Sequence, residues 1–79
     1  MPDRTYKLEE IVGVSEQSAD DAIRNAITRA SQTLRGLDWF QVVETRGTIG
    51  DGGVGQFQVT VKIGFRVMSA EELRGAGGT

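Results

Sequence analysis

The sequence predicts an α+β fold in the order strand, helix, strand, strand, with the helix on one face of the sheet. Three features indicate this fold. Apolar residues recur every three or four positions between residues 19 and 34, and they alternate very regularly with polar ones between residues 54 and 67. An Asp-Gly turn joins that second run to the one before it. Because the chain has 79 residues, we expect one domain with a small core of its own.

The first half of the chain is predicted to form a strand and then a helix. Residues 4–13 alternate loosely between apolar and polar side chains and end on a glycine. Ser18 followed by Asp21 is a variant of the capping box, so the helix is expected to begin at about Ala19. Gly36 lies where a left-handed C-terminal cap is expected. The apolar stripe of the helix consists of Ala19, Ala22, Ile23, Ala26, Ile27, Ala30 and Leu34.

Two further strands are predicted, over residues 38–49 and 54–67. The second is the clearest strand in the chain. Its apolar face consists of Phe57, Val59, Val61, Ile63, Phe65 and Val67. The Gly-Asp-Gly-Gly segment 50–53 joins the strands, and the Asp-Gly pair within it is a strong signal for a two-residue hairpin turn. A phosphate-binding loop is the weaker alternative, because the segment joins two strands and matches no phosphate-loop fingerprint.

The hairpin turn determines which side chains share a face of the sheet. With the Asp-Gly pair as the turn, Trp39 pairs with Gly64 and Thr45 pairs with Gln58. The helix-facing pairs are then Phe40 with Ile63, Val42 with Val61, and Glu44 with Val59. The outer face carries Trp39, Gln41, Val43 and Thr45 beside Gln58, Thr60, Lys62 and Gly64. One helix covers one face only, so the indole of Trp39 is expected to be exposed.

Composition argues against several functional classes. The chain has no histidine and no cysteine, and no pair of carboxylates or lysines stands out by its spacing, so we predict that it is not an enzyme and binds no metal. A formal net charge of −2 argues against nucleic acid as a partner. No apolar run approaches the roughly 20 residues of a membrane span, and the first residues lack the apolar part of a signal peptide. We therefore expect no membrane partner and a cytoplasmic location.

Trp39, the only tryptophan in the chain, has two interpretations. In the first it is an interface anchor of a self-assembling protein-interaction module without a ligand, since tryptophan is enriched at interfaces. In the second it is a stacking platform for a flat, electron-poor ring, and the Gln58 amide donates and accepts hydrogen bonds at the edge of a heterocycle. Composition alone does not separate the two.

Five short motifs follow one another along the chain. They are residues 10–15 (EIVGVS), 30–35 (ASQTLR), 37–40 (LDWF), 43–47 (VETRG) and 57–66 (FQVTVKIGFR). In this order they resemble the dodecins, a family of small flavin-binding proteins, and in particular the bacterial members. The resemblance extends from about Tyr6 to Val67, and several separate motifs in the right order make it specific. Residues 1–68 are thus expected to form a dodecin-like domain, with residues 69–79 as a Gly-rich, disordered tail.

The resemblance implies a β-α-β-β protomer whose three-stranded antiparallel sheet wraps around its helix, and twelve such protomers in a hollow shell. It implies a non-catalytic protein that stores, buffers or photoprotects flavin as stacked pairs between tryptophans of neighbouring protomers. Trp39 matches the stacking residue and Gln58 the amide that recognises the flavin edge. FMN is the flavin expected for a bacterial member, with riboflavin or FAD as alternatives. In one protomer Trp39 and Gln58 are about 20 Å apart, so both reach one ligand only through sheet curvature or a neighbouring protomer.

Three further residues are assigned to the ligand site by resemblance. Asp38 directly precedes the stacking tryptophan. Arg46 and Arg66 match basic positions that would meet the phosphate of FMN or of a second ligand such as coenzyme A. Surface salt bridges with Glu44 or Glu10 are the alternative interpretation of both arginines.

Overall fold

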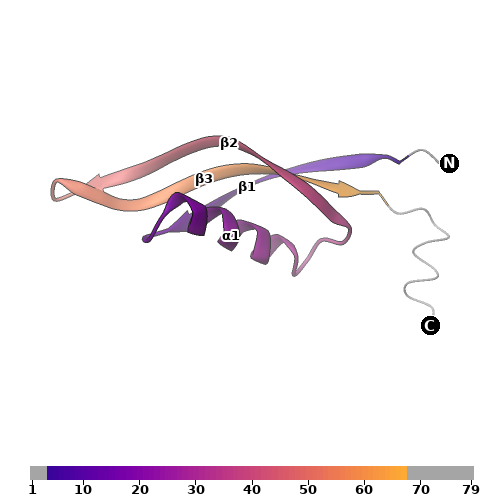
Figure 1. The fold of residues 1–79 in the computed structure, drawn as a ribbon, viewed down its shortest axis with the longest axis horizontal. Helices are drawn as coiled ribbons and strands as arrows, with labels where there is room; N and C mark the ends of the chain where they lie inside the picture. Colours follow the sequence, from indigo (N-terminus) through magenta and orange to yellow (C-terminus); the bar gives the residue numbers. More distant parts are fainter. Residues whose placement is uncertain (1–3, 68–79) are drawn as a thin grey trace.

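The computed structural model describes residues 4–67, which form one helix and a three-stranded sheet (Figure 1). The elements are β1 (Tyr6–Ser15), α1 (Ala19–Ala30), β2 (Leu37–Gly50) and β3 (Gly53–Arg66). β3 lies between β1 and β2 and is antiparallel to both. The predicted β-α-β-β order and antiparallel sheet are confirmed, and each strand lies one or two residues from its predicted bounds.

The N-terminus of α1 is capped where the sequence predicts. Ser18 is the N-cap, and its Oγ accepts a hydrogen bond from the Asp21 amide at 3.0 Å. The Asp21 carboxylate accepts a hydrogen bond from the Ser15 hydroxyl at 2.7 Å, and Ser15 also accepts one from the Gln17 amide at 2.9 Å. The last residue of β1 is therefore part of the cap, which ties the start of the helix to the end of the strand.

The C-terminus of α1 is at Ala30, six residues before the predicted cap. The Ser31 hydroxyl donates to the Thr28 carbonyl oxygen at 2.7 Å, and the Leu34 amide donates to the Ala30 carbonyl oxygen at 2.9 Å, so the chain leaves the helix in a tight turn. Gly36 has the expected positive φ of 73°, but in the loop before β2. The prediction that Gly36 caps the helix was wrong because Leu34 continues the apolar pattern from the turn, where it still packs against the core.

β2 and β3 form the predicted hairpin, but with an interrupted register. Asp51 and Gly52 occupy the turn with φ of 52° and 79°, as a type I′ turn requires. Trp39 pairs with Gly64 as predicted. Between these ends the register is shifted by one residue, because Val43 is an extra residue on β2 and Gly55 an extra residue on β3.

This shift changes which side chains lie opposite each other. The predicted pairs of Glu44 with Val59 and of Thr45 with Gln58 were wrong, because the extra residue at Val43 moves the following part of β2 along by one. Gln58 instead pairs with Arg46. Directly opposed residues share a face of a sheet, so Arg46 and Gln58 lie together on the face away from α1.

A small core lies between α1 and the sheet. Its buried members are Ala22, Ala26 and Ala30 of α1 and Val59, Val61 and Ile63 of β3. The alanines let the helix come close to the sheet at Gly13 of β1, where a Cβ would overlap the Ala22 carbonyl oxygen and lie 2.8 Å from the Ala26 Cβ. The predicted helix stripe and the alternation of the last strand are thereby confirmed.

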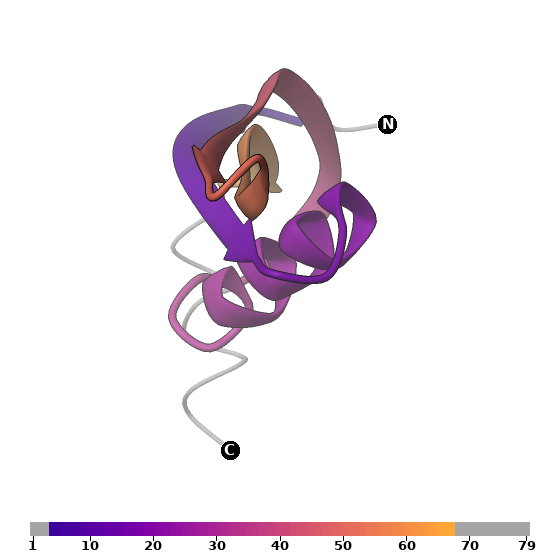
Figure 2. The ribbon, with the colours of Figure 1, turned by 90° about the vertical axis from the view of Figure 1, so that its left-hand side faces the viewer.

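β2 is the strand that the helix leaves uncovered. α1 packs against β1 and β3, while β2 bows away from it (Figure 1). Seen from the hairpin end, β1 and β2 lie on either side of β3 in a strongly twisted sheet (Figure 2). Phe40 and Val42 are 49% and 40% exposed. The predicted pairs of Phe40 with Ile63 and of Val42 with Val61 are confirmed, but neither Phe40 nor Val42 is buried in the core, because the twist carries β2 away from a single helix that follows the other two strands.

The predicted domain boundary at residue 68 and the tail at residues 69–79 lie outside the described residues. Within residues 4–67, the one helix is too short and too polar to cross a membrane.

Candidate functional site

The indole of Trp39 lies across Gly64 on the outer face of the sheet. A Cβ on Gly64 would overlap the Cε2 and Cζ2 atoms of Trp39 and lie 2.8 Å from Cδ2. The glycine therefore provides the space in which the ring rests on the neighbouring strand. Leu8 of β1 pairs with Gly64 from the other side, so an apolar side chain continues the same row. Trp39 is 44% exposed, which confirms the prediction that its ring is not part of the core.

Asp38 is held beside the tryptophan by a tyrosine. It is the extra residue in the irregular pairing between Leu37 and Trp39, and its Oδ2 accepts a hydrogen bond from the Tyr6 hydroxyl at 2.8 Å. Tyr6 pairs with Arg66 at the end of β3, and the Arg66 amide donates to the Gly36 carbonyl oxygen at 3.0 Å. Asp38, Trp39 and Arg66 therefore lie at the same end of the sheet, and we call them the tryptophan group.

A second set of polar side chains lies further along β3. The Arg46 Nε donates to the Gln58 Oε1 at 2.9 Å, and the Gln58 Nε2 donates to the Gln56 Oε1 at 2.9 Å. Arg46 is thus hydrogen-bonded to Gln58, whereas the alternative interpretation expected a salt bridge between Arg46 and Glu44. We call Arg46, Gln56 and Gln58 the glutamine group. The extra residue at Val43 is what brings Arg46 opposite Gln58.

The two groups are separate within one protomer. Gly64, which carries the indole, and Gln58 are six residues apart on β3, or about 20 Å at the usual rise of a strand. All five predicted site residues therefore lie on the sheet and fall into two clusters, Asp38, Trp39 and Arg66 in one and Arg46 and Gln58 in the other. A single protomer does not bring both clusters to one ring-sized ligand.

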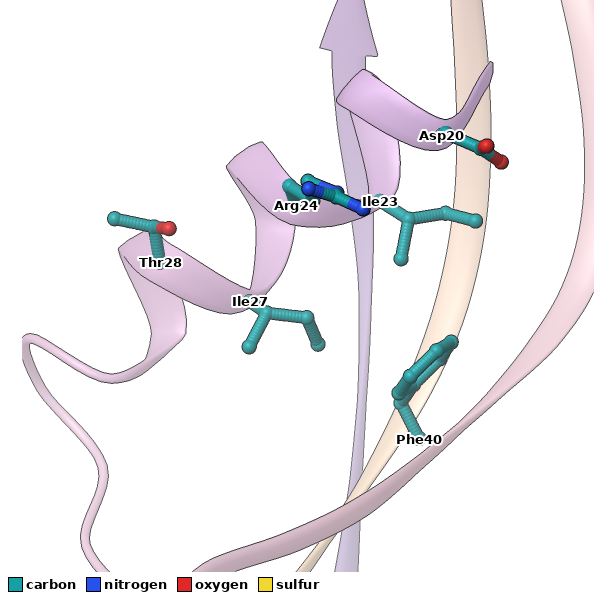
Figure 3. Close-up of a pocket in the computed structure, with 6 residues that line it drawn as sticks. All are labelled: Asp20, Ile23, Arg24, Ile27, Thr28 and Phe40. Atoms are coloured by element: carbon teal, nitrogen blue, oxygen red, sulfur yellow. The ribbon is translucent and has the colours of Figure 1, made fainter.

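A hollow lies on the opposite side of the sheet. It has a volume of about 570 Å³ and lies between α1 and β2, where Ile23 and Ile27 face Phe40 across the gap (Figure 3). Asp20, Arg24 and Thr28 complete its lining. Neither the tryptophan group nor the glutamine group lines this hollow. It is the space that β2 leaves open where the strand turns away from α1. A smaller hollow of about 140 Å³ beside it is lined by Asp38 and Trp39 together with Ile27, Leu37, Phe40 and Ile63.

The outer face offers stacking and hydrogen bonding. An exposed indole attracts another flat ring through dispersion and its π-system, and carboxamide groups recognise the polar edge of a heterocycle. Residues 4–67 contain no cluster of three or more carboxylates, cysteines or histidines that would hold a metal ion. The side chains of this face are thus able to stack against a flat ring and to hydrogen-bond with its polar edge.

Comparison with known proteins agrees with this geometry. The dodecin family model matches residues 5–68. The chain belongs to the dodecin family. A dodecin of Thermus thermophilus is 52% identical over 64 residues, which cover 81% of this chain and 93% of that protein. The solved dodecins of Streptomyces coelicolor and Streptomyces davaonensis are each 53% identical, with TM-scores of 0.84 and 0.83, and cover 89% and 86% of this chain and 100% of their own.

Dodecins are generally small, non-catalytic binding proteins. The family is known for binding flavins and for assembling into dodecamers. A calcium dodecin of Mycobacterium tuberculosis is also similar, with a TM-score of 0.71, and covers 84% of this chain and 94% of its own. At 21% identity that likeness extends to the fold alone.

Three residues at the site escaped prediction as contributors. Gly64 was recognised only as the partner of Trp39, although a glycine in a strand interior already indicates close approach of another group. Gln56 and Gln58 are two residues apart on one strand, so the sequence places both side chains on the same face, but it does not show that they form a hydrogen bond. Tyr6 is 32 positions from Asp38 in the sequence, and no local pattern indicates their hydrogen bond.

Proposed function

We propose that this protein binds flavin without catalysis and stores, buffers or photoprotects it. The observation that supports this function best is the half-exposed indole of Trp39, supported on Gly64 in a family of flavin binders. One side of the ring rests on the sheet, which leaves the other for an isoalloxazine ring. A tricyclic, electron-poor ring of that kind is a good stacking partner for indole.

The ligand site is proposed to be shared between protomers of a homododecamer. Because the tryptophan group and the glutamine group are about 20 Å apart in one chain, the Gln58 that recognises a flavin edge would come from a neighbour. Stacked flavin pairs would then lie between the tryptophans of two protomers. The uncovered side of β2, with Phe40 and Val42 half exposed, gives each protomer apolar surface to bury against another copy.

FMN is the flavin we propose, with riboflavin or FAD as alternatives, and coenzyme A as a second ligand. Arg46 and Arg66 are the cationic groups assigned to a phosphate. Arg46 uses its Nε for Gln58, so its terminal NH₂ groups are the ones that face a phosphate. Asp38, aligned by Tyr6, is proposed to accept a hydrogen bond from the ligand. A cytoplasmic location fits a store of flavin cofactors.

The decisive experiment identifies the ligand. Protein purified without added flavin would be denatured, and the released small molecules identified by mass spectrometry. The stripped protein would then be titrated with riboflavin and FMN while flavin fluorescence is measured. We expect a flavin in the released fraction and strong quenching on rebinding. A colourless protein that quenches neither flavin would refute this function and favour the protein-interaction module, with Trp39 as an interface anchor.

A further inference from the structure

We infer that Gln56 is a positioning residue for the flavin site, which together with Arg46 holds the Gln58 amide in one of its two flip states. This inference rests on the proposed flavin-binding function and concerns a residue two positions from the recognition amide. Gln56, Gln58 and Arg46 form one hydrogen-bonded chain on the outer face, with both contacts at 2.9 Å.

The two ends of this chain have opposite hydrogen-bonding character. Arg46 is a donor only, so the atom of Gln58 that faces it must be the carbonyl oxygen. The Gln56 oxygen is an acceptor, so the Gln58 atom that faces it must be the amide nitrogen. A flipped Gln58 would set nitrogen against the guanidinium N–H and oxygen against the Gln56 oxygen. The contact with Arg46 would be repulsive, and the Gln56 amide would have to turn over as well to keep a bond to Gln58. Arg46 therefore selects the orientation of Gln58, and the Gln56 oxygen stabilises that orientation by accepting from the Gln58 amide nitrogen.

Both bonds leave part of the Gln58 amide free for a ligand. The nitrogen has a second N–H, and the oxygen has a second lone pair. Gln58 itself is half-buried between β1 and β2, where it pairs with Val14 and with Arg46. Its remaining donor and acceptor therefore face outward in a fixed order along the strand, with less freedom than a solvated glutamine has.

A fixed order matters because the polar edge of an isoalloxazine is nearly symmetric. That edge presents a carbonyl, an N–H and a second carbonyl in a row. A freely flipping amide could pair with either half of it, in two lateral positions of the ring. An amide held in one orientation pairs with one half only, and so fixes where the ring lies over the indole.

Gln56 can be tested with a matched set of variants. Gln56→Met removes the acceptor and keeps an unbranched chain, Gln56→Thr is a second truncation suited to a strand, and Gln56→Glu retains the acceptor. Gln32→Met makes the same chemical change in the exposed turn after α1 and serves as the control. Each variant would be titrated with riboflavin and with 3-methylriboflavin, which lacks the N3–H, by quenching of flavin fluorescence. Light scattering and thermal unfolding would check assembly and folding.

We expect Gln56→Met and Gln56→Thr to bind riboflavin about three- to tenfold more weakly, the usual effect of one hydrogen bond. Their preference for riboflavin over the methylated analogue should shrink, whereas Gln56→Glu and Gln32→Met should retain both affinity and preference. Unchanged affinity and preference in the folded Met and Thr variants would overturn the inference alone, as would a Glu variant that recovers neither. Absence of riboflavin binding by the unaltered protein would overturn the proposed function and this inference together.

Discussion

β2 and β3 have the same length of 14 residues but very different environments. β3 is the central strand and contributes Val59, Val61 and Ile63 to the core, each at most 1% exposed. β2 is an edge strand, and all of its residues except Leu37 are exposed. Apolar residues of similar kind are therefore buried on β3 and exposed to solvent on β2. Alternation in sequence identifies the face that an apolar residue occupies, but the position of the strand in the sheet determines whether that face is covered.

The cross-strand pair Ile63 and Phe40 tests this difference most directly, and it has the largest expected effect. Ile63→Ala should destabilise the protein by about 2–5 kcal/mol, because a fully buried side chain leaves a cavity. Phe40→Ala should cost an isolated protomer far less, since half of the ring already meets solvent. In an assembly that buries β2, however, its cost should approach that of Ile63→Ala and depend on protein concentration.

Thermal unfolding over a dilution series, combined with size-exclusion chromatography and light scattering, would measure both effects. The unaltered protein should have a mass near twelve times 8.5 kDa, and Phe40→Ala should dissociate at a higher concentration. A stable, folded monomer at micromolar concentration would show that β2 needs no partner. In that case β2 would be an ordinary solvent-exposed edge strand, and its exposed apolar residues would not be an assembly surface.

Trp39→Ala should produce the next largest effect, on ligand binding. Loss of one stacking partner costs about 1–3 kcal/mol per ring, or roughly 5- to 150-fold in affinity for riboflavin. The core on β3 does not include this residue, so assembly should be unchanged. Trp39→Phe, which keeps an aromatic ring, should retain part of the affinity. Riboflavin titrations of both variants measure this affinity. If Trp39→Ala bound riboflavin as tightly as the unaltered protein, Trp39 of β2 would not be part of the ligand site.

Gly64→Ala, a substitution on β3, should reduce the affinity for riboflavin less than Trp39→Ala does. The new methyl group overlaps the place of the indole, so the ring of Trp39 must tilt or move. We expect riboflavin binding to weaken several-fold, together with a change in the intrinsic fluorescence of Trp39. Thr60→Ala, on the same face of β3, is a suitable control because it introduces no such overlap. If Gly64→Ala bound riboflavin normally and showed unchanged fluorescence, the support of the indole by the central strand would be unimportant.

Arg66→Ala should have the smallest effect. A partly exposed ion pair contributes about 0.2–1 kcal/mol and is weakened by salt. The protein has a formal net charge of −2, so any preference for FMN over riboflavin must come from local donors such as Arg66. The ratio of the two affinities should therefore fall towards one in the variant, and in the unaltered protein as salt is raised. Equal affinities of the unaltered protein for both flavins at low salt would assign the arginines to another role.

The sequence predicts those parts of the fold that follow from period and turn chemistry. The alanine stripe of α1, its cap at Ser18, the Asp-Gly turn and the pairing of Trp39 with Gly64 were all correct. The resemblance identified the family, and the site residues it assigns lie on the sheet as two clusters. Long-range hydrogen bonds such as Tyr6 to Asp38 have no periodic signal and were missed.

The register in the middle of the hairpin was mispredicted although two weak signals were present. Val42 and Val43 are adjacent apolar residues that interrupt the alternation of β2, and Gly55 is an isolated glycine within β3. Both are typical of a bulge. Counting pairs outward from the turn assumes that each residue of β2 has one partner on β3. The count is correct at the turn and at Trp39, but between Gly55 and Val43 it is off by one residue, so it assigned the wrong partner to Gln58.

The two extra residues offset each other in register, and this bears on how the hairpin can change in length. Val43 displaces the pairing by one and Gly55 restores it, while the ladder between β1 and β3 begins beyond Gly55 at Phe57. Removing both residues would leave a hairpin one residue shorter on each strand, with its turn and all its remaining partners retained. Removing either alone would delete one bulge, join the pairs on its two sides into a regular ladder, and leave the other bulge in place. A single deletion at Val43 or at Gly55 is therefore expected to change the local bend and twist of this arm while the remaining pairs keep their partners.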